Sequence, residues 1–334
     1  MADPPASQYT DSASIIRQHL QRDILAAELK WALFNSALRS YKRESLLKPF
    51  PSLFKTQDDL KDFDSLISCA NSISNFRRLD PDRLTEQQSY LLSWVLGTRN
   101  FQIKSLNVDN CADLYRVDDT GKRLLKNRKP SFIFEVVPNE LAEQKFANSR
   151  QDRELLQAYH GSQLHNFHSI LHHGLVSHLN KTSLFGEGTY LSPALDVSLH
   201  WSPPSSPGLP RSSPLSQRLS CIALCQIIND SQGVQFDTRP SHRRSAFDNG
   251  IPEEYIVVRN DSLLRVKYLI IYADKQSSAW SRATQNWVRR NQSWIVIFAY
   301  AFMLICVGLL NSRGIKFYLK RWSNYFSLPP YEET

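Results

Sequence analysis

Apolar residues follow a helical rhythm through the first third of the chain. From 15 to 47 they recur at spacings of three and four, as on the buried face of one amphipathic α-helix or of two helices with a break near Asn35. Lys48-Pro49 ends this run, because proline cannot continue a helix. The helical pattern then returns at 57–71, 72–79 and 85–96. Since strand-like alternation is almost absent here, residues 1–98 are predicted to form an all-helical domain.

The pattern changes to that of β-strands after residue 100. Phe101-Gln102-Ile103-Lys104-Ser105-Leu106 alternates between apolar and polar residues, as a half-buried strand does. Many strands with few helices between them indicate an α+β fold with a mixed, mostly antiparallel sheet, and we assign residues 99–280 to it. The further strand-like runs are 131–137, 219–228, 255–258 and 264–272, and helices are expected at 141–156, 164–172 and 193–201.

A third pattern appears near the C-terminus, where residues 294–310 carry no charge. As a helix this segment would span about 25 Å, slightly less than a hydrocarbon core of about 30 Å. Polar neighbours extend it to 293–312, and arginines lie on both sides. We therefore expect a single transmembrane helix, followed by a short basic and aromatic tail at 313–334. Because few residues follow the segment, it would insert after synthesis as a tail anchor and leave the larger part of the chain in the cytosol.

Charge and cysteine content change this picture little. The 334 residues carry a formal net charge of +8, and the lysines and arginines are spread along the sequence rather than gathered into the stripe typical of nucleic-acid-binding proteins. Nucleic acid is therefore not an expected partner. The five cysteines are scattered, which argues against a disulfide framework and fits the cytosol. Cys221 and Cys225 would share one face of a strand about 13 Å apart, so we expect them in the core.

Two local features invite a functional interpretation, and we favour a structural one for each. Residues 202–217 are rich in proline and serine, so they are predicted to form a mobile surface insertion without a fold of their own. His165, His168 and His172 would share one side of a helix, and the last two have the spacing of a metal site. The zincin glutamate is replaced by Ser169, and a third ligand is missing. We therefore expect solvated or capping histidines on a surface helix, and no metal.

The candidate chemistry lies between residues 158 and 201. A short apolar run ends in His160-Gly161-Ser162, and Phe185-Gly186-Glu187-Gly188-Thr189-Tyr190-Leu191 later leads into a second short strand. Glycines at such places let the backbone approach a ligand closely or adopt a positive φ. A histidine and a tyrosine at the ends of two neighbouring strands would form a polar pair in a cleft, which we interpret as the active site. With Asn166-Phe167-x-Ser169-Ile170-Leu171-x-x-Gly174-Leu175, these motifs resemble the catalytic core of the poly(ADP-ribose) polymerase-like ADP-ribosyltransferases, and in particular their tail-anchored endoplasmic-reticulum branch.

The resemblance implies a reaction and a set of ligands. NAD would be the substrate, and its bond between nicotinamide and ribose would break at an oxocarbenium-like centre. The Gly161 backbone would bind the nicotinamide carboxamide with help from the Ser198 hydroxyl, and His160 would bind a ribose hydroxyl. Tyr190 would stack on the nicotinamide ring, as would Trp201 in place of the family's usual second tyrosine. The implied NAD-binding residues are His160, Gly161, Ser162, Tyr190, Ser198 and Trp201, with residues 181–187 as a covering loop.

The family's third catalytic position decides between one transfer and a polymer. Polymer-forming members have a glutamate there, on a late strand. Counting back from Lys267-Tyr268-Leu269 without a gap puts Tyr255 at this position, whereas matching the local string Glu-Tyr-Ile-Val puts Glu254 there. Side chains alternate along a strand, so only one can face the cleft, and we favour Tyr255 because a strand pair tends to keep its length. A phenol, with an unperturbed pKa of about 10, cannot replace a carboxylate at neutral pH. The implied catalytic residues are His160, Tyr190 and Tyr255.

The sequence thus predicts a membrane-anchored, NAD-dependent protein mono-ADP-ribosyltransferase. The resemblance alone implies the endoplasmic-reticulum membrane, a catalytic domain facing the cytosol, a role in the unfolded protein response, and acceptor proteins that include the enzyme itself. Membrane lipid is the expected partner of the C-terminal helix. Two alternatives stay open. One is a catalytically weak docking module of the same fold that binds NAD or ADP-ribose, and the other is a metal-dependent hydrolase built on the histidine helix.

Overall fold

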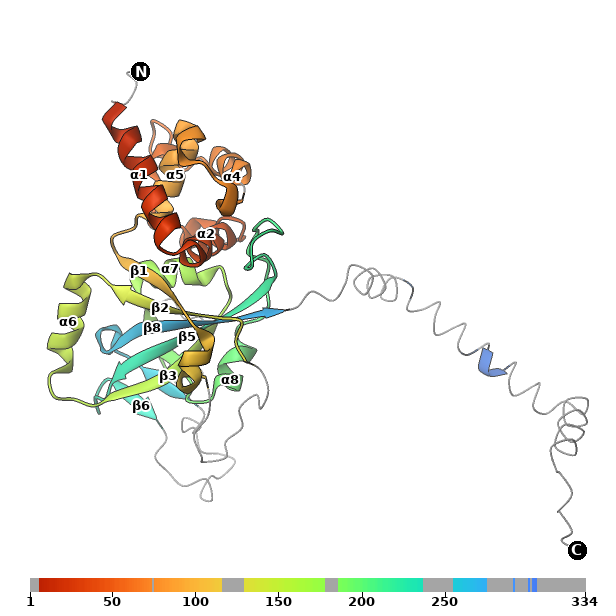
Figure 1. Cartoon of the computed structure of the whole chain (residues 1–334). Coiled ribbons are helices and arrows are strands. Elements are labelled where there is room, and N and C mark those ends of the chain that lie inside the picture. The colour runs from red at the N-terminus through yellow and green to blue at the C-terminus, as the bar shows by residue number, and fades with distance from the viewer. Residues whose placement is uncertain are drawn as a thin grey trace, which may run out of the picture. The chain divides into compact units, whose positions relative to one another are not determined.

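The computed structural model describes residues 6–73, 75–115, 129–177, 186–236 and 255–274, together with 291, 300 and 302–304. Residues 1–275 make up one compact unit, in which the helices of the N-terminal part lie against a core of β-strands (Figure 1). Most of the predicted membrane segment 293–312 falls outside the described residues. Among the residues that are described, no helix has both the length and the apolar character needed to cross a membrane.

The N-terminal part is helical, as its periodicity predicts, but the helices divide at a different place. The break is at Asp23, whose carboxylate accepts a hydrogen bond from the backbone N–H of Ala26 and so caps the second helix. The expected break near Asn35 is wrong, because Asn35 is buried inside that helix and accepts a hydrogen bond from Arg39. The helices are α1 (Ala6–Arg22), α2 (Ile24–Leu38), α3 (Arg43–Leu46), α4 (Phe63–Ser72) and α5 (Glu86–Leu96).

The second part is an α+β fold, as predicted, and every strand pair among the described residues is antiparallel. A five-stranded sheet has the order β1-β2-β8-β5-β3, and a three-stranded sheet has the order β4-β7-β6. The strands are β1 (Phe101–Leu106), β2 (Phe132–Pro138), β3 (Leu155–Ser162), β4 (Thr189–Leu191), β5 (Arg218–Ile228), β6 (Val234–Phe236), β7 (Ile256–Val258) and β8 (Leu264–Asp274).

Three helices accompany these strands: α6 (Glu140–Arg150), α7 (Asn166–His173) and α8 (Leu195–His200). The helix expected at 141–156 is too long. It ends at Arg150, Gln151 adopts a positive φ of 50°, and the last residues of the predicted helix begin β3 instead. Their pairing with β5, which comes from far along the chain, outweighs the local helical pattern. Strand β6, which the sequence pattern did not predict, pairs with β7 at the edge of the small sheet.

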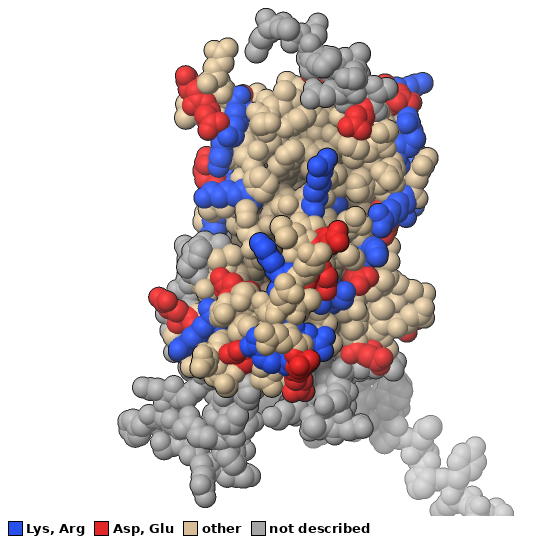
Figure 2. All heavy atoms as spheres, turned by 90° about the vertical axis from the view of Figure 1, so that its left-hand side faces the viewer, with Lys and Arg blue, Asp and Glu red and all other residues tan. Residues whose placement is uncertain are grey.

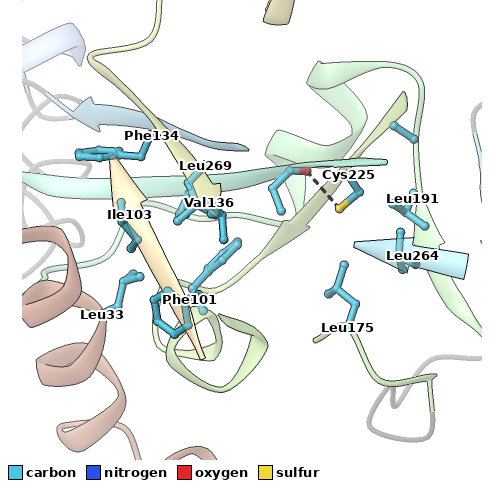
Figure 3. Close-up of a cluster of buried hydrophobic side chains, with 14 of the residues drawn as sticks. Leu33, Phe101, Ile103, Phe134, Val136, Leu175, Leu191, Cys225, Leu264 and Leu269 are labelled. Atoms are coloured by element: carbon cyan, nitrogen blue, oxygen red, sulfur yellow. Dashed lines mark hydrogen bonds between the residues drawn. The ribbon is translucent and has the colours of Figure 1, made fainter. Parts of the chain in front are cut away.

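Helix α2 joins the two parts through a shared apolar core. Side chains on all sides of α2 are buried, because α1 and α5 lie on one side of the helix and α7 and β1 lie on the other. Leu33 of α2 points toward Phe101 and Ile103 of β1 in the close-up of this core (Figure 3). A second cluster, centred on Trp31 and Phe34, lies among the N-terminal helices. Cys221 and Cys225 are buried in the first cluster, as predicted.

Residues 202–217, here called the strap, are ordered against both parts of the unit, so the prediction of a mobile surface insertion is wrong. Ser205 forms a backbone bridge with Leu219 of β5, and Leu215 is fully buried. At its far end the Ser213 hydroxyl donates a 2.9 Å hydrogen bond to the buried carboxylate of Glu28 in α2. The prolines limit the conformations of the strap without preventing burial, because serine hydroxyls satisfy the polar groups it covers.

Charged side chains of both signs are interspersed on the face that Figure 2 displays, and no band of a single sign crosses it. This face includes α1 and α6, where Arg17 pairs with Asp82 and Arg265 pairs with Glu143. Exposed pairs of this kind contribute about 0–1 kcal/mol each, so the fold depends mainly on its apolar clusters.

Candidate active site

The two sheets meet at one backbone pair, and this junction brings the predicted motifs together. Tyr159 of β3 donates its N–H to the carbonyl of Ser192, just after β4, over 2.7 Å, and accepts the Ser192 N–H over 2.8 Å. His160 and Tyr190 therefore lie at adjoining strand ends. Nδ1 of His160 is 2.9 Å from the backbone oxygen of Tyr190, so the expected histidine and tyrosine pair exists, but through a main-chain atom.

The contact with Tyr190 determines which nitrogen of His160 carries the proton. A carbonyl oxygen only accepts, so Nδ1 must donate, which leaves Nε2 with a lone pair when the ring is neutral. Burial lowers the pKa of His160, and the hydrogen bond to the Tyr190 carbonyl opposes that shift in part. The ring is consequently neutral at neutral pH, and Nε2 is a hydrogen-bond acceptor suited to a hydroxyl group.

The backbone of Gly161 presents a donor and an acceptor at the edge of the five-stranded sheet. Along an antiparallel strand the N–H and C=O groups of successive residues point to alternate sides. Tyr159 directs both groups to Ser192, away from β5, so Gly161, two residues later, directs its groups to the same side. Strand β4 has moved away at that point. Gly161 therefore offers a donor and an acceptor side by side, the arrangement that binds a primary carboxamide.

A glycine is required at position 161 because α8 lies directly against it. A Cβ atom there would be 1.7 Å from the carbonyl oxygen of Ser198 and 3.1 Å from Cβ of Trp201. The Ser198 hydroxyl donates to the carbonyl of Tyr159 over 2.9 Å, which ties α8 to β3 and leaves its lone pairs as acceptors. Trp201, at the end of α8, is 50% exposed. An exposed indole beside a free backbone edge is a surface on which a flat ring can stack.

Tyr190 is held by its hydroxyl group and by the strand that carries it. The phenol donates a 2.7 Å hydrogen bond to the carbonyl of Gly186, which fixes the ring of this half-buried side chain. Gly188 has φ of +154°, and a Cβ atom there would lie 2.6 Å from Cγ1 of Val257. The glycine therefore lets β4 pair closely with β7. Residues 181–185 of the expected covering loop lie outside the described part of the chain.

Ser162, the last residue of β3, has a structural partner as well as its predicted place in the site. Its hydroxyl oxygen accepts a 2.9 Å hydrogen bond from the side-chain amide of Asn166, in the first turn of α7. The hydroxyl proton remains available to a ligand. The structure thus gathers the predicted NAD-binding residues around the end of β3, with Tyr190 from β4 and with Ser198 and Trp201 from the end of α8.

The register of the small sheet places Tyr255 on the same face as Tyr190. Tyr190 is directly opposite Val257, and side chains two residues apart on a strand share a face. Tyr255 extends that alternation by one residue before β7. Glu254 lies outside the described residues, so the choice between Tyr255 and Glu254 stays a prediction.

The histidine helix α7 packs against the N-terminal helices, so the expectation of solvated surface histidines is wrong for His168. That ring is 5% exposed and lies against Phe34 of α2, with ring centroids 5.7 Å apart, and against Trp94 of α5 at 6.5 Å. Burial, with smaller effects of His172 and His173, lowers the pKa of His168 to about 3. Among the described residues, no group of three or more histidine, cysteine, aspartate or glutamate side chains could hold a metal.

Sequence reasoning missed two residues that build the site. Tyr159 and Ser192 join the sheets through main-chain groups, and a main-chain pair has no signature in side-chain types. The position of Ser192, directly after a predicted strand, was visible in the sequence, but its partner was not.

Comparison with known proteins gives matches over most of the chain. A model of the ARTD15 N-terminal domain matches residues 18–96, and a model of the poly(ADP-ribose) polymerase catalytic domain matches residues 117–232. The chain is 36% identical over 307 residues to "Protein mono-ADP-ribosyltransferase PARP16" of Mus musculus, covering 89% of this chain and 94% of that protein. For the Homo sapiens protein of the same name, identity is 35% over 316 residues, covering 91% and 96%. Homo sapiens "Protein mono-ADP-ribosyltransferase PARP8" is 25% identical over 254 residues, covering 61% of this chain and 28% of that protein.

Proposed function

The chain belongs to the poly(ADP-ribose) polymerase family of ADP-ribosyltransferases, and on this premise we propose that it is a protein mono-ADP-ribosyltransferase that uses NAD as its substrate. It transfers one ADP-ribose unit to a protein acceptor and releases nicotinamide. The observation that carries the proposal is the free backbone edge of Gly161 beside the half-exposed Trp201. The relatives that share about nine tenths of their length with this chain have mono-ADP-ribosyltransferase in their names.

The residues at the end of β3 suit the two halves of the reacting bond. Gly161 accepts the carboxamide N–H and donates to its oxygen, and the Ser198 hydroxyl supplies a further acceptor. Tyr190 and Trp201 hold the nicotinamide ring flat by stacking. Nε2 of His160, the acceptor nitrogen, binds a ribose hydroxyl. These contacts fix the orientation of the reactive bond, which is a large part of what such a transfer needs.

The chemistry follows from the charge that NAD carries. When the bond between the nicotinamide nitrogen and ribose C1′ breaks, its electron pair stays on nicotinamide and cancels the positive charge of that ring. Positive charge develops on the ribose, and a nucleophilic oxygen or nitrogen of the acceptor protein attacks C1′ from the opposite face. A hydroxyl or amine nucleophile releases its proton to solvent in this step. The site supports this step by positioning the reactive bond. His160 is neutral, so it adds no positive charge beside the developing cation.

We propose that Tyr255 occupies the position at which polymer-forming relatives carry a glutamate. The strand register supports it, since Tyr255 shares a face with Tyr190. A phenol does not accept a proton from an attacking ribose hydroxyl as a carboxylate does, so the reaction stops after one unit. If the protein forms ladders of polymer on itself, or if Glu254→Gln abolishes transfer while Tyr255→Ala does not, this assignment is wrong.

We further propose that residues 293–312 anchor the enzyme in the endoplasmic-reticulum membrane, with the helical domain, 1–98, and the transferase domain, 99–280, in the cytosol. The uncharged run 294–310 supports a membrane segment, and the family likeness supports the organelle. In this setting, acceptors at the cytosolic face and a role in the unfolded protein response follow. Alkaline carbonate extraction of full-length protein and of a variant lacking 293–334 tests the anchor, since only the former should remain with membranes.

The test of the function itself is transfer of label from NAD. Full-length protein is incubated with adenine-labelled NAD, alone and with a cell extract, beside His160→Ala and beside Ser206→Ala, an exposed strap residue outside the implied NAD-binding set. Label on protein from the wild type and Ser206→Ala, but not from His160→Ala, supports the proposal. Binding of NAD without any transfer would instead support the docking module.

A further inference from the structure

One buried serine outside the implied NAD-binding set holds the end of α8 to the central sheet. Ser202 is 1% exposed, and its hydroxyl makes two hydrogen bonds to the same residue. Its Oγ accepts the backbone N–H of Cys221 over 2.8 Å and donates to the backbone carbonyl of Cys221 over 2.8 Å. A single side chain thus satisfies both main-chain groups of one strand residue.

The position of Cys221 explains why the two Ser202 hydrogen bonds affect the candidate active site. Cys221 of β5 is in register with Ser162, the residue at which β3 ends. Beyond this point the edge of β5 is covered by the strap, and Ser205 takes up pairing with Leu219. The Ser202 hydroxyl therefore occupies the place where β3 would otherwise form its next pair of main-chain hydrogen bonds with β5. Without it, two buried main-chain groups lose their partner, and leaving such groups unpaired destabilises this junction.

A chain of short contacts connects Ser202 to the proposed nicotinamide pocket. The Ser202 N–H donates to the carbonyl of Leu199 over 3.0 Å, and the Trp201 N–H donates to the carbonyl of Ser198 over 3.1 Å, so this turn closes α8. The same Ser198 carbonyl is the atom that lies against Gly161. The position of the turn thus determines both the close approach to Gly161 and the place of the Trp201 indole.

We infer that Ser202 is a positioning residue for the nicotinamide half of NAD. It binds nothing in the substrate itself. It holds the last turn of α8 against β5, so that Trp201 stays beside the free edge of Gly161. The inference rests on the proposed function, because it assigns NAD to that pocket.

The strap offers a matched control at its other end. Ser213 is also buried, at 5% exposure, and its hydroxyl also donates to a buried acceptor, Glu28. Ser213→Ala removes a hydroxyl of the same kind from the same segment, but eleven residues from Ser202 and against α2 instead of β5. A general loss of stability affects both variants, whereas a loss of position at the pocket affects only Ser202→Ala.

The experiment compares full-length wild type, Ser202→Ala and Ser213→Ala for the Kd of NAD by calorimetry, for KM and kcat of transfer, and for melting temperature. Ser202→Ala is expected to raise KM and Kd about tenfold with kcat within about twofold, because it removes binding common to ground and transition states. Ser213→Ala is expected to lower the melting temperature with KM and Kd unchanged. In a Trp201→Ala background, Ser202→Ala should raise Kd by less than about twofold more, since Ser202 acts through Trp201.

Three results would overturn the inference. They are an unchanged KM and Kd in Ser202→Ala, equal increases of Kd in Ser202→Ala and Ser213→Ala, or a tenfold increase of Kd when Ser202→Ala is added to Trp201→Ala. If Ser202→Ala does not fold, Ser202→Cys keeps a hydrogen-bonding side chain, with a larger atom that is a weaker donor and acceptor, and its Kd should rise about threefold. An unchanged Kd in that variant overturns the inference as well. Failure of the proposed function looks different, because the wild type itself would then transfer no ADP-ribose.

Discussion

Replacing Gly161 by alanine tests the geometry on which the site depends. The added Cβ atom would lie 1.7 Å from the Ser198 oxygen, and real Cβ atoms do not come within 3.0 Å of such an atom, so α8 must retreat by at least about 1.3 Å. Overpacking of this kind costs about 1–3 kcal/mol of the free energy of unfolding. A misplacement of about 1 Å near the chemistry can cost about 100-fold in rate. We therefore expect kcat/KM for NAD to fall by about two orders of magnitude.

The assay is initial-rate transfer from labelled NAD, with the melting temperature recorded for each protein. Gly174→Ala provides the control for lost stability. Gly174 has φ of +83° and ψ of −177°, a conformation that is almost exclusive to glycine, and no atom lies within 4 Å of the added Cβ. The substitution therefore costs about 1–3 kcal/mol in backbone strain without touching α8. Both variants should melt at lower temperature, and only Gly161→Ala should lose transfer.

The reasoning fails if Gly161→Ala keeps wild-type kcat/KM, because α8 would then not crowd this position. It also fails if Gly174→Ala loses as much kcat/KM as Gly161→Ala, since lost stability and not the close approach would then explain the effect. A lower melting temperature alone, with normal transfer in Gly161→Ala, would mean that the pocket tolerates the displaced helix and that Trp201 does not set NAD binding.

Three further outcomes follow. The pH profile of kcat/KM should stay flat as pH falls through 6.5 and drop only below it, because burial lowers the pKa of His160 and the neutral ring is the active form; an acid limb above 6.5 would contradict this. Between pH 6.5 and 4 the unfolded chain binds a proton at His168, whereas the folded chain, in which the pKa of His168 is about 3, does not. The free energy of unfolding, measured by urea titration, should therefore fall as pH falls, by up to about 1.4 kcal/mol per pH unit from this residue. His168→Phe should reduce that slope. Glu28→Ala, which removes the acceptor of the buried Ser213 hydroxyl proton, should lower the free energy of unfolding by about 1–3 kcal/mol. Glu28→Gln, which keeps an acceptor, should lower it by clearly less, and equal losses would show that the hydrogen bond is unimportant.

The local pattern of apolar residues was enough to predict the elements whose apolar side chains face the core as their periodicity indicates. The alternation of Phe101 to Leu106 and the apolar run that becomes β5 predicted strands that the sheet then uses. The motif around His160 and Gly161 and the tyrosine of β4 were recognisable because their residue types are unusual in combination. The predicted strands depend on neighbours a few positions away along the chain, and the motifs depend on a known combination of residue types.

The sequence by itself therefore determined the helical N-terminal part and the antiparallel α+β core, and it pointed to the candidate site residues. Only the tertiary structure decided that α2 is buried on all sides, that His168 lies among aromatic rings, and that the strap is ordered by Glu28 and Cys221. The physical reason is the same in each case. Periodicity records which side of an element is apolar, but burial and hydrogen-bond partners come from segments tens to hundreds of residues away, and no local pattern encodes which segment that is.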